Sequence, residues 1–177
     1  MINRSFSPFP VLTTKRLVLR QLLESDAEEI FLLRSDAVIN KYLNRQPSKS
    51  SADALKFITI INESIAKNES LYWAITMADN SKLIGTVCLF DISAEHNSGE
   101  IGYELLTDHQ GQGIMNEAIT SVIKFAFQIP GLTTINAVSH KDNQASLKLL
   151  QKLNFENTNS FDESNPDLIV FRLSKAV

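Results

Sequence analysis

The pattern of apolar and polar residues divides the chain into strands and helices. Residues 16–22 (RLVLRQL) alternate apolar and polar side chains at period two, which is typical of a strand with one buried face. Short runs rich in aromatic and β-branched residues predict six further strands, at 71–78, 82–90, 99–106, 133–139, 155–161 and 168–174. The first two of these runs are joined by Asp79-Asn80-Ser81, which predicts a hairpin.

Four stretches between the strands carry apolar residues at helical spacing. They predict helices within residues 24–36, 50–67, 114–128 and 143–153. Ser25 and Asp26 are candidates to cap the first helix, serines open the second in the same way, and Pro130-Gly131 ends the third. This mixture of elements predicts an α/β (α+β) protein with helices on the faces of a twisted, mixed sheet.

Length and charge narrow the classes of function. A chain of 177 residues is the size of one ordinary domain, and no repeat or linker divides it. We expect an N-terminal extension at residues 1–10 and a single domain at 11–177. The formal net charge is −3 and the pI is about 5.6, so no bulk positive field attracts nucleic acid or an anionic membrane. A small molecule or another protein is the expected partner.

No segment of the sequence indicates export or membrane insertion. No run approaches the roughly 20 apolar residues of a membrane helix, and the first ten residues lack the apolar core of a secretory signal. The single cysteine, Cys88, lies in an apolar run and suits a reducing compartment as a small buried residue. We expect a cytoplasmic protein, either a monomer or a homodimer.

The stretch DHQGQGIMNEAI (108–119) places two of the six glycines of the chain between a strand and a helix. Such a turn presents unpaired N–H groups and the positive end of a helix dipole, which together suit a phosphate. A Walker loop fails because Ile114 and Met115 follow the last glycine, and a dinucleotide motif fails because Asn116 replaces its third glycine. Two readings remain: backbone amides of residues 111–115 hold a pyrophosphate, or the glycines only turn the chain.

The motifs around this loop resemble those of a known family. GEIGYELLTDHQGQGIMNEA, preceded by LIGTVCLFDI and followed by NQASLKLLQKLNF, resembles the GNAT superfamily of acetyl-CoA-dependent N-acetyltransferases. The opening LTTKRLVLRQLLESDAEEI is similar to the branch with ribosomal-protein N-terminal (alanine) acetyltransferases, and the resemblance covers about residues 11–173. It implies the GNAT fold: a mixed, mostly antiparallel twisted sheet of about six to seven strands, flanked by about four helices.

The family pattern of Arg or Gln, two residues, Gly, one residue, and Gly or Ala falls on Gln110, Gly113 and Met115, where Met115 departs from the small residue expected. The resemblance implies that Leu105 and Leu106 pair with the pantetheine arm of CoA. It implies that the pyrophosphate is bound by the backbone of Gln110, Gly111, Gln112, Gly113, Ile114 and Met115.

The resemblance implies an enzyme that transfers the acetyl group of acetyl-CoA to a primary amine by direct attack in a ternary complex, with no metal. The amine would belong to a peptide or protein N-terminus or to a small molecule. An acyl-CoA-binding sensor or inactive paralogue without turnover is the alternative, and a scaffold that binds a protein partner is a third. The acidic residues Asp36, Glu63 and Glu69 are an electrostatic hint of a cationic acceptor.

The strand GEIGYELL offers two carboxylates for base catalysis. At period two, Glu100 and Glu104 share one face, with their Cα atoms roughly 13 Å apart, so they cannot share a proton. By resemblance a glutamate on this strand serves as general base, with Glu100 the first choice and Glu104 the second. For each, a structural ion pair with a helix-borne Lys or Arg is the competing interpretation.

The proton donor for the departing thiolate is harder to place. Many family members carry a tyrosine at the position of Leu150. In the similar branch the candidates are Asn143, which would contact the pantetheine, and Ser146, which would approach the sulfur. Ordinary capping of the helix by these residues is the alternative. Asn154 stands where the family usually has glycine and is expected in a left-handed conformation.

Overall fold

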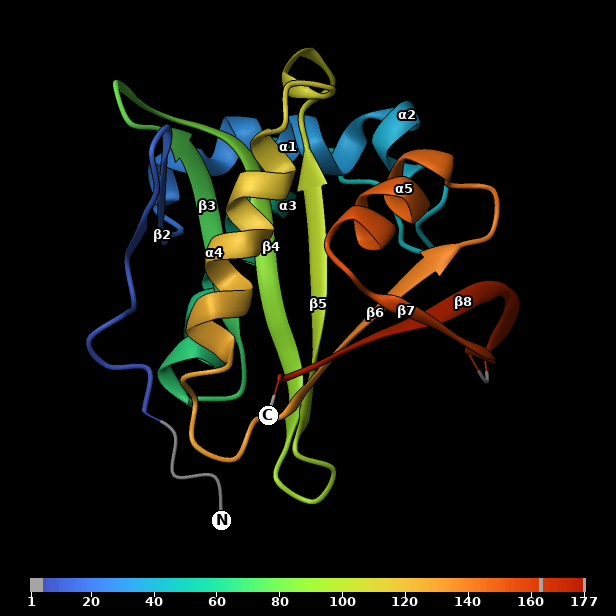
Figure 1. Ribbon diagram of the computed structural model, residues 1–177. Helices are drawn as coiled ribbons and strands as arrows, with labels where there is room; N and C mark the ends of the chain where they lie inside the picture. The colour runs from blue at the N-terminus through green and yellow to red at the C-terminus, as the bar shows by residue number, and fades with distance from the viewer. Residues whose placement is uncertain (1–4, 163, 177) are drawn as a thin grey trace.

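One mixed sheet runs through the computed structural model, which describes residues 5–162 and 164–176 (Figure 1). Its eight strands lie in the order β1-β2-β3-β4-β5-β6-β8-β7. Their bounds are β1 Leu12–Thr13, β2 Leu17–Gln21, β3 Leu71–Met77, β4 Asn80–Ser93, β5 Ser98–Leu105, β6 Thr134–His140, β7 Glu156–Asp162 and β8 Asn165–Ser174. All neighbouring strands pair antiparallel except β5 and β6, which run parallel.

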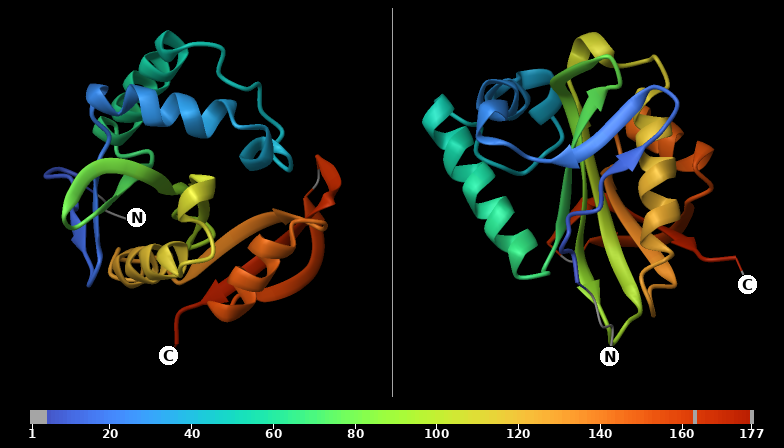
Figure 2. Two further views of the ribbon diagram at one scale, coloured as in Figure 1. Left: turned by 90° about the horizontal axis from the view of Figure 1, so that it is seen from above. Right: turned by 90° about the vertical axis from the view of Figure 1, so that its left-hand side faces the viewer.

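Five α-helices lie among the described residues, and they cover both faces of the sheet (Figure 2). They are α1 Ala27–Ser35, α2 Ala37–Asn40, α3 Ser51–Ala66, α4 Ile114–Ala126 and α5 Gln144–Lys152, with short 3-10 turns at Glu24–Asp26 and Thr107–His109. Helices α1 and α3 lie on one face of the sheet, and α4 and α5 lie on the other.

The predicted α/β class is confirmed, and each predicted element is present to within a few residues of its expected bounds. The structure has more elements than the expected six to seven strands and four helices, because β1 and α2 were not predicted. These elements span two and four residues, which is too short for either hydrophobic period to show in the sequence.

The helix caps differ in detail from the expectation. Ser50 caps α3 as a serine at the start of that helix should, since its side chain accepts a hydrogen bond from the Asp53 N–H. Asp26 occupies the N-cap position of α1, but its carboxylate accepts from the Leu23 N–H and pairs with Arg20 at 2.8 Å. The Asp26 side chain thus fixes the entry to the helix rather than its first turn.

The two faces of the sheet bury separate apolar clusters. On the α4 side, the fully buried Trp73 packs with Ile101, Leu105 and the buried stripe of α4. On the α1 and α3 side, Tyr72 packs with Ile30, Ile58 and other residues of those helices. Alternation along β5 therefore sends Ile101, Tyr103 and Leu105 to the α4 side and the intervening residues to the α1 side.

Strands β5 and β6 separate soon after they begin to pair. Their parallel register holds for three positions, which end at Glu100 opposite Asn136. Beyond these positions β5 continues to Leu105 and β6 to His140, and Figure 1 shows the two strands diverging between α4 and α5. The divergence leaves one edge of β5 without a strand partner among the described residues, in the middle of the sheet.

The described residues before β1 pack on the sheet. Phe6 is buried in the core on the α4 side, and the Trp73 indole donates a hydrogen bond to the Pro10 carbonyl at 2.7 Å. The division between residues 10 and 11 stays a prediction. Within the described part of the chain, no helix is long and apolar enough to cross a membrane.

Candidate active site

The loop before α4 requires both of its glycines for backbone reasons. Gly111 has φ +73° and Gly113 has φ +75°, in the left-handed region that other residues adopt only at a cost. A Cβ at Gly111 would meet nothing within 4 Å, and one at Gly113 would meet only Arg16 at 3.6 Å. Space beside the loop is therefore open, and the conformation of the backbone accounts for the choice of glycine.

The same loop presents a run of N–H groups without partners. In the described part of the chain, nothing accepts a hydrogen bond from the backbone N–H groups of residues 111–116, and the first intrahelical donor of α4 is Glu117, bound to the Gly113 carbonyl. Gly113 occupies the N-cap position, where glycine has no side chain to cap the helix. Six free donors at the positive end of a 13-residue helix are an arrangement that suits an anion.

The side chains of the loop point away from these donors or hold the loop in shape. Ile114 and Met115 are 2% and 8% exposed and pack in the core, so the methionine that departs from the family pattern leaves the amides uncovered. Gln110 differs from its neighbours, because its N–H donates to the Thr107 carbonyl and its side-chain Nε2 donates to the Leu105 carbonyl at 2.9 Å. Gln110 therefore ties the loop to the end of β5.

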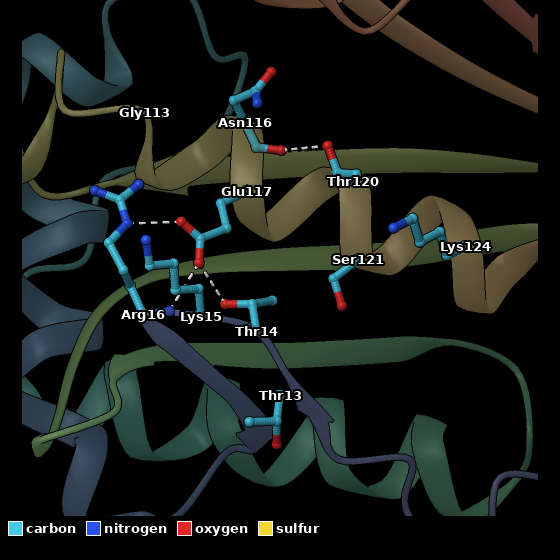
Figure 3. A pocket seen from close by; sticks show the side chains of 10 residues that line it. All are labelled: Thr13, Thr14, Lys15, Arg16, Gly113, Asn116, Glu117, Thr120, Ser121 and Lys124. Atoms are coloured by element: carbon cyan, nitrogen blue, oxygen red, sulfur yellow. Dashed lines mark hydrogen bonds and ion pairs between the residues drawn. The ribbon is translucent and has the colours of Figure 1, made fainter.

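An ion-pair network holds the start of α4 against the β1–β2 turn (Figure 3). Glu117 accepts hydrogen bonds from Thr14 Oγ1 at 2.6 Å, from the Arg16 N–H at 2.9 Å and from Arg16 Nε at 2.7 Å. Arg16 Nη1 also donates to the Gln112 carbonyl at 3.1 Å. Burial acts to raise the pKa of Glu117, but these hydrogen bonds outweigh it and hold the pKa below its ordinary value. Arg16 is thus placed to position the glycine loop.

Two grooves flank α4. One, of about 660 Å³, lies toward the β1–β2 turn and is lined by the Arg16–Glu117 network together with Lys15 and Lys124. The other, of about 390 Å³, lies toward the end of α5 and is lined by Lys124 and Lys152 among others, and Asn116 borders both. Positively charged side chains therefore lie on both sides of α4.

The open edge of β5 is adjacent to the loop. The Leu106 N–H donates to the Ile84 carbonyl of β4 at 2.9 Å and its carbonyl accepts from the His109 N–H, so both backbone groups of Leu106 are engaged. Alternation along the strand turns the backbone groups of Tyr103 and Leu105 toward the diverging β6. Because the Leu105 carbonyl already accepts from Gln110 Nε2, both backbone groups of Tyr103 and the N–H of Leu105, rather than Leu106, offer the edge at which an extended ligand can pair.

Tyr103 and Ser146 meet across this divergence. Their hydroxyl oxygens are 2.8 Å apart, although one residue lies on β5 and the other in the first turn of α5. Asn143 caps α5, because its Oδ1 accepts from the Ser146 N–H, so the capping interpretation of Asn143 is confirmed. Burial raises the pKa of Tyr103 to about 12, and the hydrogen bond with Ser146 offsets only part of this rise. The Tyr103 phenol therefore keeps its proton at neutral pH.

Glu100 and Glu104 share the α1 side of β5, as period two requires, but their surroundings differ. Among residues 5–162 and 164–176, no group forms a hydrogen bond or ion pair with the Glu100 carboxylate. Burial, together with repulsion from Asp91 and Asp162, raises the pKa of Glu100 to about 7. A half-buried carboxylate with a pKa near neutrality can accept a proton and release it again.

Glu104 is tightly engaged in an ion pair. Its Oε2 accepts from Arg45 Nη2 at 2.6 Å, and the side chain is only 8% exposed. Its other oxygen, Oε1, is buried and has no partner among the described residues. The competing interpretation of an ion pair is therefore confirmed for Glu104, with the arginine on the loop after α2 rather than on a helix.

Sequence reasoning missed three residues that the fold brings into the site. From the sequence, no role in the site was assigned to Tyr103, Arg16 or Arg45. Arg16 carried a weak signal, since it opens the predicted strand at residues 16–22. The other two depend on contacts across 43 and 59 positions of the sequence, for which no local pattern exists.

Comparison with known proteins places the chain among acetyltransferases. A family model described as an acetyltransferase (GNAT) domain matches residues 16–156. The chain is 34% identical over 148 residues to the uncharacterized N-acetyltransferase YoaA of Bacillus subtilis (strain 168), a match that covers 84% of each protein. It is 26% identical over 162 residues to the ribosomal protein uS5 alanine N-acetyltransferase of Escherichia coli (strain K12), covering 86% of this chain and 81% of that one.

Solved structures share the architecture. The ribosomal L7/L12 α-N-protein acetyltransferase RimL, in complex with coenzyme A, superposes with a TM-score of 0.82 and 18% identity, covering 93% of this chain and 98% of RimL. At this identity the match shows the fold alone. It confirms the expected fold class, with the strand and helix counts given above.

Proposed function

The chain belongs to the GNAT acetyltransferase family, and from that premise we propose that it transfers the acetyl group of acetyl-CoA to the amine of a peptide N-terminus or a small molecule. N-acetyltransferase activity follows from the family. The acceptor and the roles of individual residues are the substance of the proposal.

The six unpaired N–H groups at the start of α4 carry the assignment of the cofactor site. A pyrophosphate supplies the charge and the multiple acceptor oxygens that such a row of donors satisfies. Gly111 and Gly113 leave the row uncovered, and the lysines that line the two grooves beside α4 add positive charge for further phosphates. Tyr103 and Leu105 offer the edge of β5 to the pantetheine arm. Bound there, acetyl-CoA would supply an activated thioester.

The surroundings of Glu100 support its assignment as the general base. It lies on the α1 side of β5, which is opposite to the side of Tyr103, and its pKa of about 7 leaves about half of it ionised at neutral pH. Its carboxylate would take a proton from the acceptor amine, directly or through water. An α-amine has an ordinary pKa near 8, so the demand on the base is modest.

The contact between Tyr103 and Ser146 supports their assignment as the proton donor to the departing thiolate. The two hydroxyl groups lie on the α4 and α5 side, where β5 and β6 separate. Because Tyr103 stays protonated, it can supply a hydrogen to Ser146 Oγ while Ser146 donates to the leaving sulfur. The base and the donor would thus approach the open edge of β5 from opposite faces of the sheet.

The relatives favour a peptide or protein N-terminus as one source of the amine, since two of them are named for acting on ribosomal proteins.

A sensor that binds acyl-CoA without turnover is the competing function. Single-turnover transfer from radiolabelled acetyl-CoA to a panel of peptides and small amines separates the two. We expect label on at least one class of amine within seconds to minutes. Binding of acetyl-CoA without transfer to any amine would favour the sensor.

A further inference from the structure

Two buried polar groups of opposite kind lie without partners on the α1 side of β5. Glu104 Oε1 is an acceptor without a donor, and Arg34 Nε is a donor without an acceptor, among the residues that the structure describes. An unsatisfied buried polar group is costly, and a bound ligand is one way to satisfy it.

The two groups belong to one cluster, formed by α1, the loop after α2, α3 and the sheet. Arg45 Nη2 contacts Glu104 Oε2 at 2.6 Å and the Leu33 carbonyl at 3.4 Å, and the charges of both Arg45 and Glu104 act on the Arg34 guanidinium. The Arg34 guanidinium lies 3.9 Å from the centre of the Phe57 ring, which packs edge-on against Tyr72 at 5.6 Å.

The cluster is held in place by contacts that do not use its free groups. Arg45 Nε donates to Asn40 Oδ1 at 2.6 Å, and the Tyr72 hydroxyl pairs with Thr86 Oγ1 at 3.1 Å. These hydrogen bonds therefore leave Glu104 Oε1 and Arg34 Nε without partners among the described residues. Hydrogen bonds thus hold Arg45 and Tyr72 before a ligand binds, so fewer side chains have to be ordered on binding.

The charges in the cluster do not cancel. Two guanidinium groups face one carboxylate, and Tyr72 is neutral because burial, and then the negative charge of Glu104, raise its pKa well above 10. Burial, and then the nearby Arg45, lower the pKa of Arg34, while the negative charge of Glu104 acts to raise it. The cluster carries a net charge of +1 and favours a ligand group that is anionic.

We propose that this cluster, Arg34, Arg45 and Glu104 on a wall of Phe57 and Tyr72, is an acceptor subsite for an amine that also carries a carboxylate. Glu104 Oε1 accepts a hydrogen bond from the amine, and Arg34 donates to the carboxylate, as its planar fork suits. The α-carboxylate of a free amino acid and the side-chain carboxylate of an acidic N-terminal residue are the two sources of this chemistry. The inference rests on the proposed acetyltransferase function and narrows its acceptor.

The test is a binding measurement with nearly isosteric pairs of acceptors. Amino acids and their carboxamides form one arm, and the amidated dipeptides Asp-Ala and Asn-Ala form the other. Each is titrated by calorimetry into the full chain in the presence of CoA. We expect the carboxylate member to bind about ten- to a hundred-fold more tightly in at least one arm, as a charge-assisted hydrogen bond supplies.

Arg34→Gln should reduce that preference below about twofold, since it removes the donor fork but keeps a polar side chain of similar length. Lys56→Gln is the matched control, because it removes an exposed positive charge on α3 beside Phe57 and should leave the preference unchanged. If Arg34→Gln does not fold, Arg34→Lys keeps the charge without the fork and should give an intermediate preference.

Equal binding of both members in both arms, or no binding of either, overturns the inference. So does a preference that survives Arg34→Gln in a folded protein. Failure of the acetyltransferase function is a separate result: the carboxylate member would bind without receiving an acetyl group. Conversely, acetylation of amines regardless of a carboxylate would sustain the function and overturn the subsite.

Discussion

Replacement of Gly113 by valine tests the glycine loop directly. At φ +75° the backbone conformation costs an L-residue about 1–2 kcal/mol. The nearest atom to a new Cβ is Arg16 Nη2 at 3.6 Å, an ordinary contact with the end of a flexible side chain, so the Cβ itself causes no clash. The loop is exposed and can relax in the free enzyme, but it must return to the strained conformation to present its N–H groups.

The cost of this return should therefore be seen in cofactor affinity. A penalty of about 1–2 kcal/mol corresponds to a Kd for acetyl-CoA that is about five- to thirty-fold weaker. Isothermal titration calorimetry of acetyl-CoA into wild type and Gly113→Val measures it, with thermal unfolding to show that both proteins are folded.

Gly131→Val is the matched control. Gly131 is also exposed and has φ +84°, but it lies in the turn after α4. The same substitution there should leave the Kd for acetyl-CoA within about twofold of wild type. An unchanged Kd in folded Gly113→Val would refute the reasoning, because the strained loop would then play no part in binding the cofactor.

Three further substitutions test the remaining parts of the site. Glu100→Gln should lower kcat/KM by about tenfold at pH 7.5 and abolish the rise in rate as the wild-type carboxylate ionises near pH 7. The folded-state pKa of Glu100 lies above the ordinary 4.5, so the fold loses stability as the pH rises from 4.5 to about 7 and Glu100 ionises. Glu100→Gln should therefore have the higher Tm at pH 8. An unchanged pH–rate profile in this variant would remove the base role. Ser146→Ala should lower kcat about tenfold with little change in the Kd for acetyl-CoA, and full turnover would assign thiolate protonation to water. Glu117→Gln should reduce the free energy of unfolding by about 1–3 kcal/mol at pH 7 and weaken acetyl-CoA binding. Since the pKa of Glu117 is lowered in the folded state, the carboxylate stabilises the fold above pH 4.5, and this stabilisation is lost as the pH falls through the folded-state pKa. If the variant keeps both its stability and its affinity for acetyl-CoA at pH 7, the network does not have the proposed role.

Local patterns in the sequence predicted the elements of the fold and part of the site. Period two placed Glu100 and Glu104 on one face of β5, and the glycine pair predicted a special turn before α4, which its positive φ angles confirm. Asn154, expected in a left-handed conformation, has φ +62°. Each of these follows from one residue and its immediate neighbours.

The contacts that distinguish the roles of these residues are not local. Whether Glu104 or Glu100 is paired depends on Arg45, which reaches β5 only because α1 and the following loop fold over that face of the sheet. The Tyr103–Ser146 contact likewise requires α5 to dock beside the diverging end of β5. Such placements depend on tertiary packing, which periodicity does not specify.

The most direct test is a crystal structure of the full chain with acetyl-CoA. It should show the pyrophosphate oxygens within about 3 Å of the backbone nitrogens of residues 111–116. The thioester should lie at the open edge of β5, between Glu100 on one face and the Tyr103–Ser146 pair on the other. A pyrophosphate bound elsewhere, with the N–H groups of the α4 loop facing only water, would contradict the account.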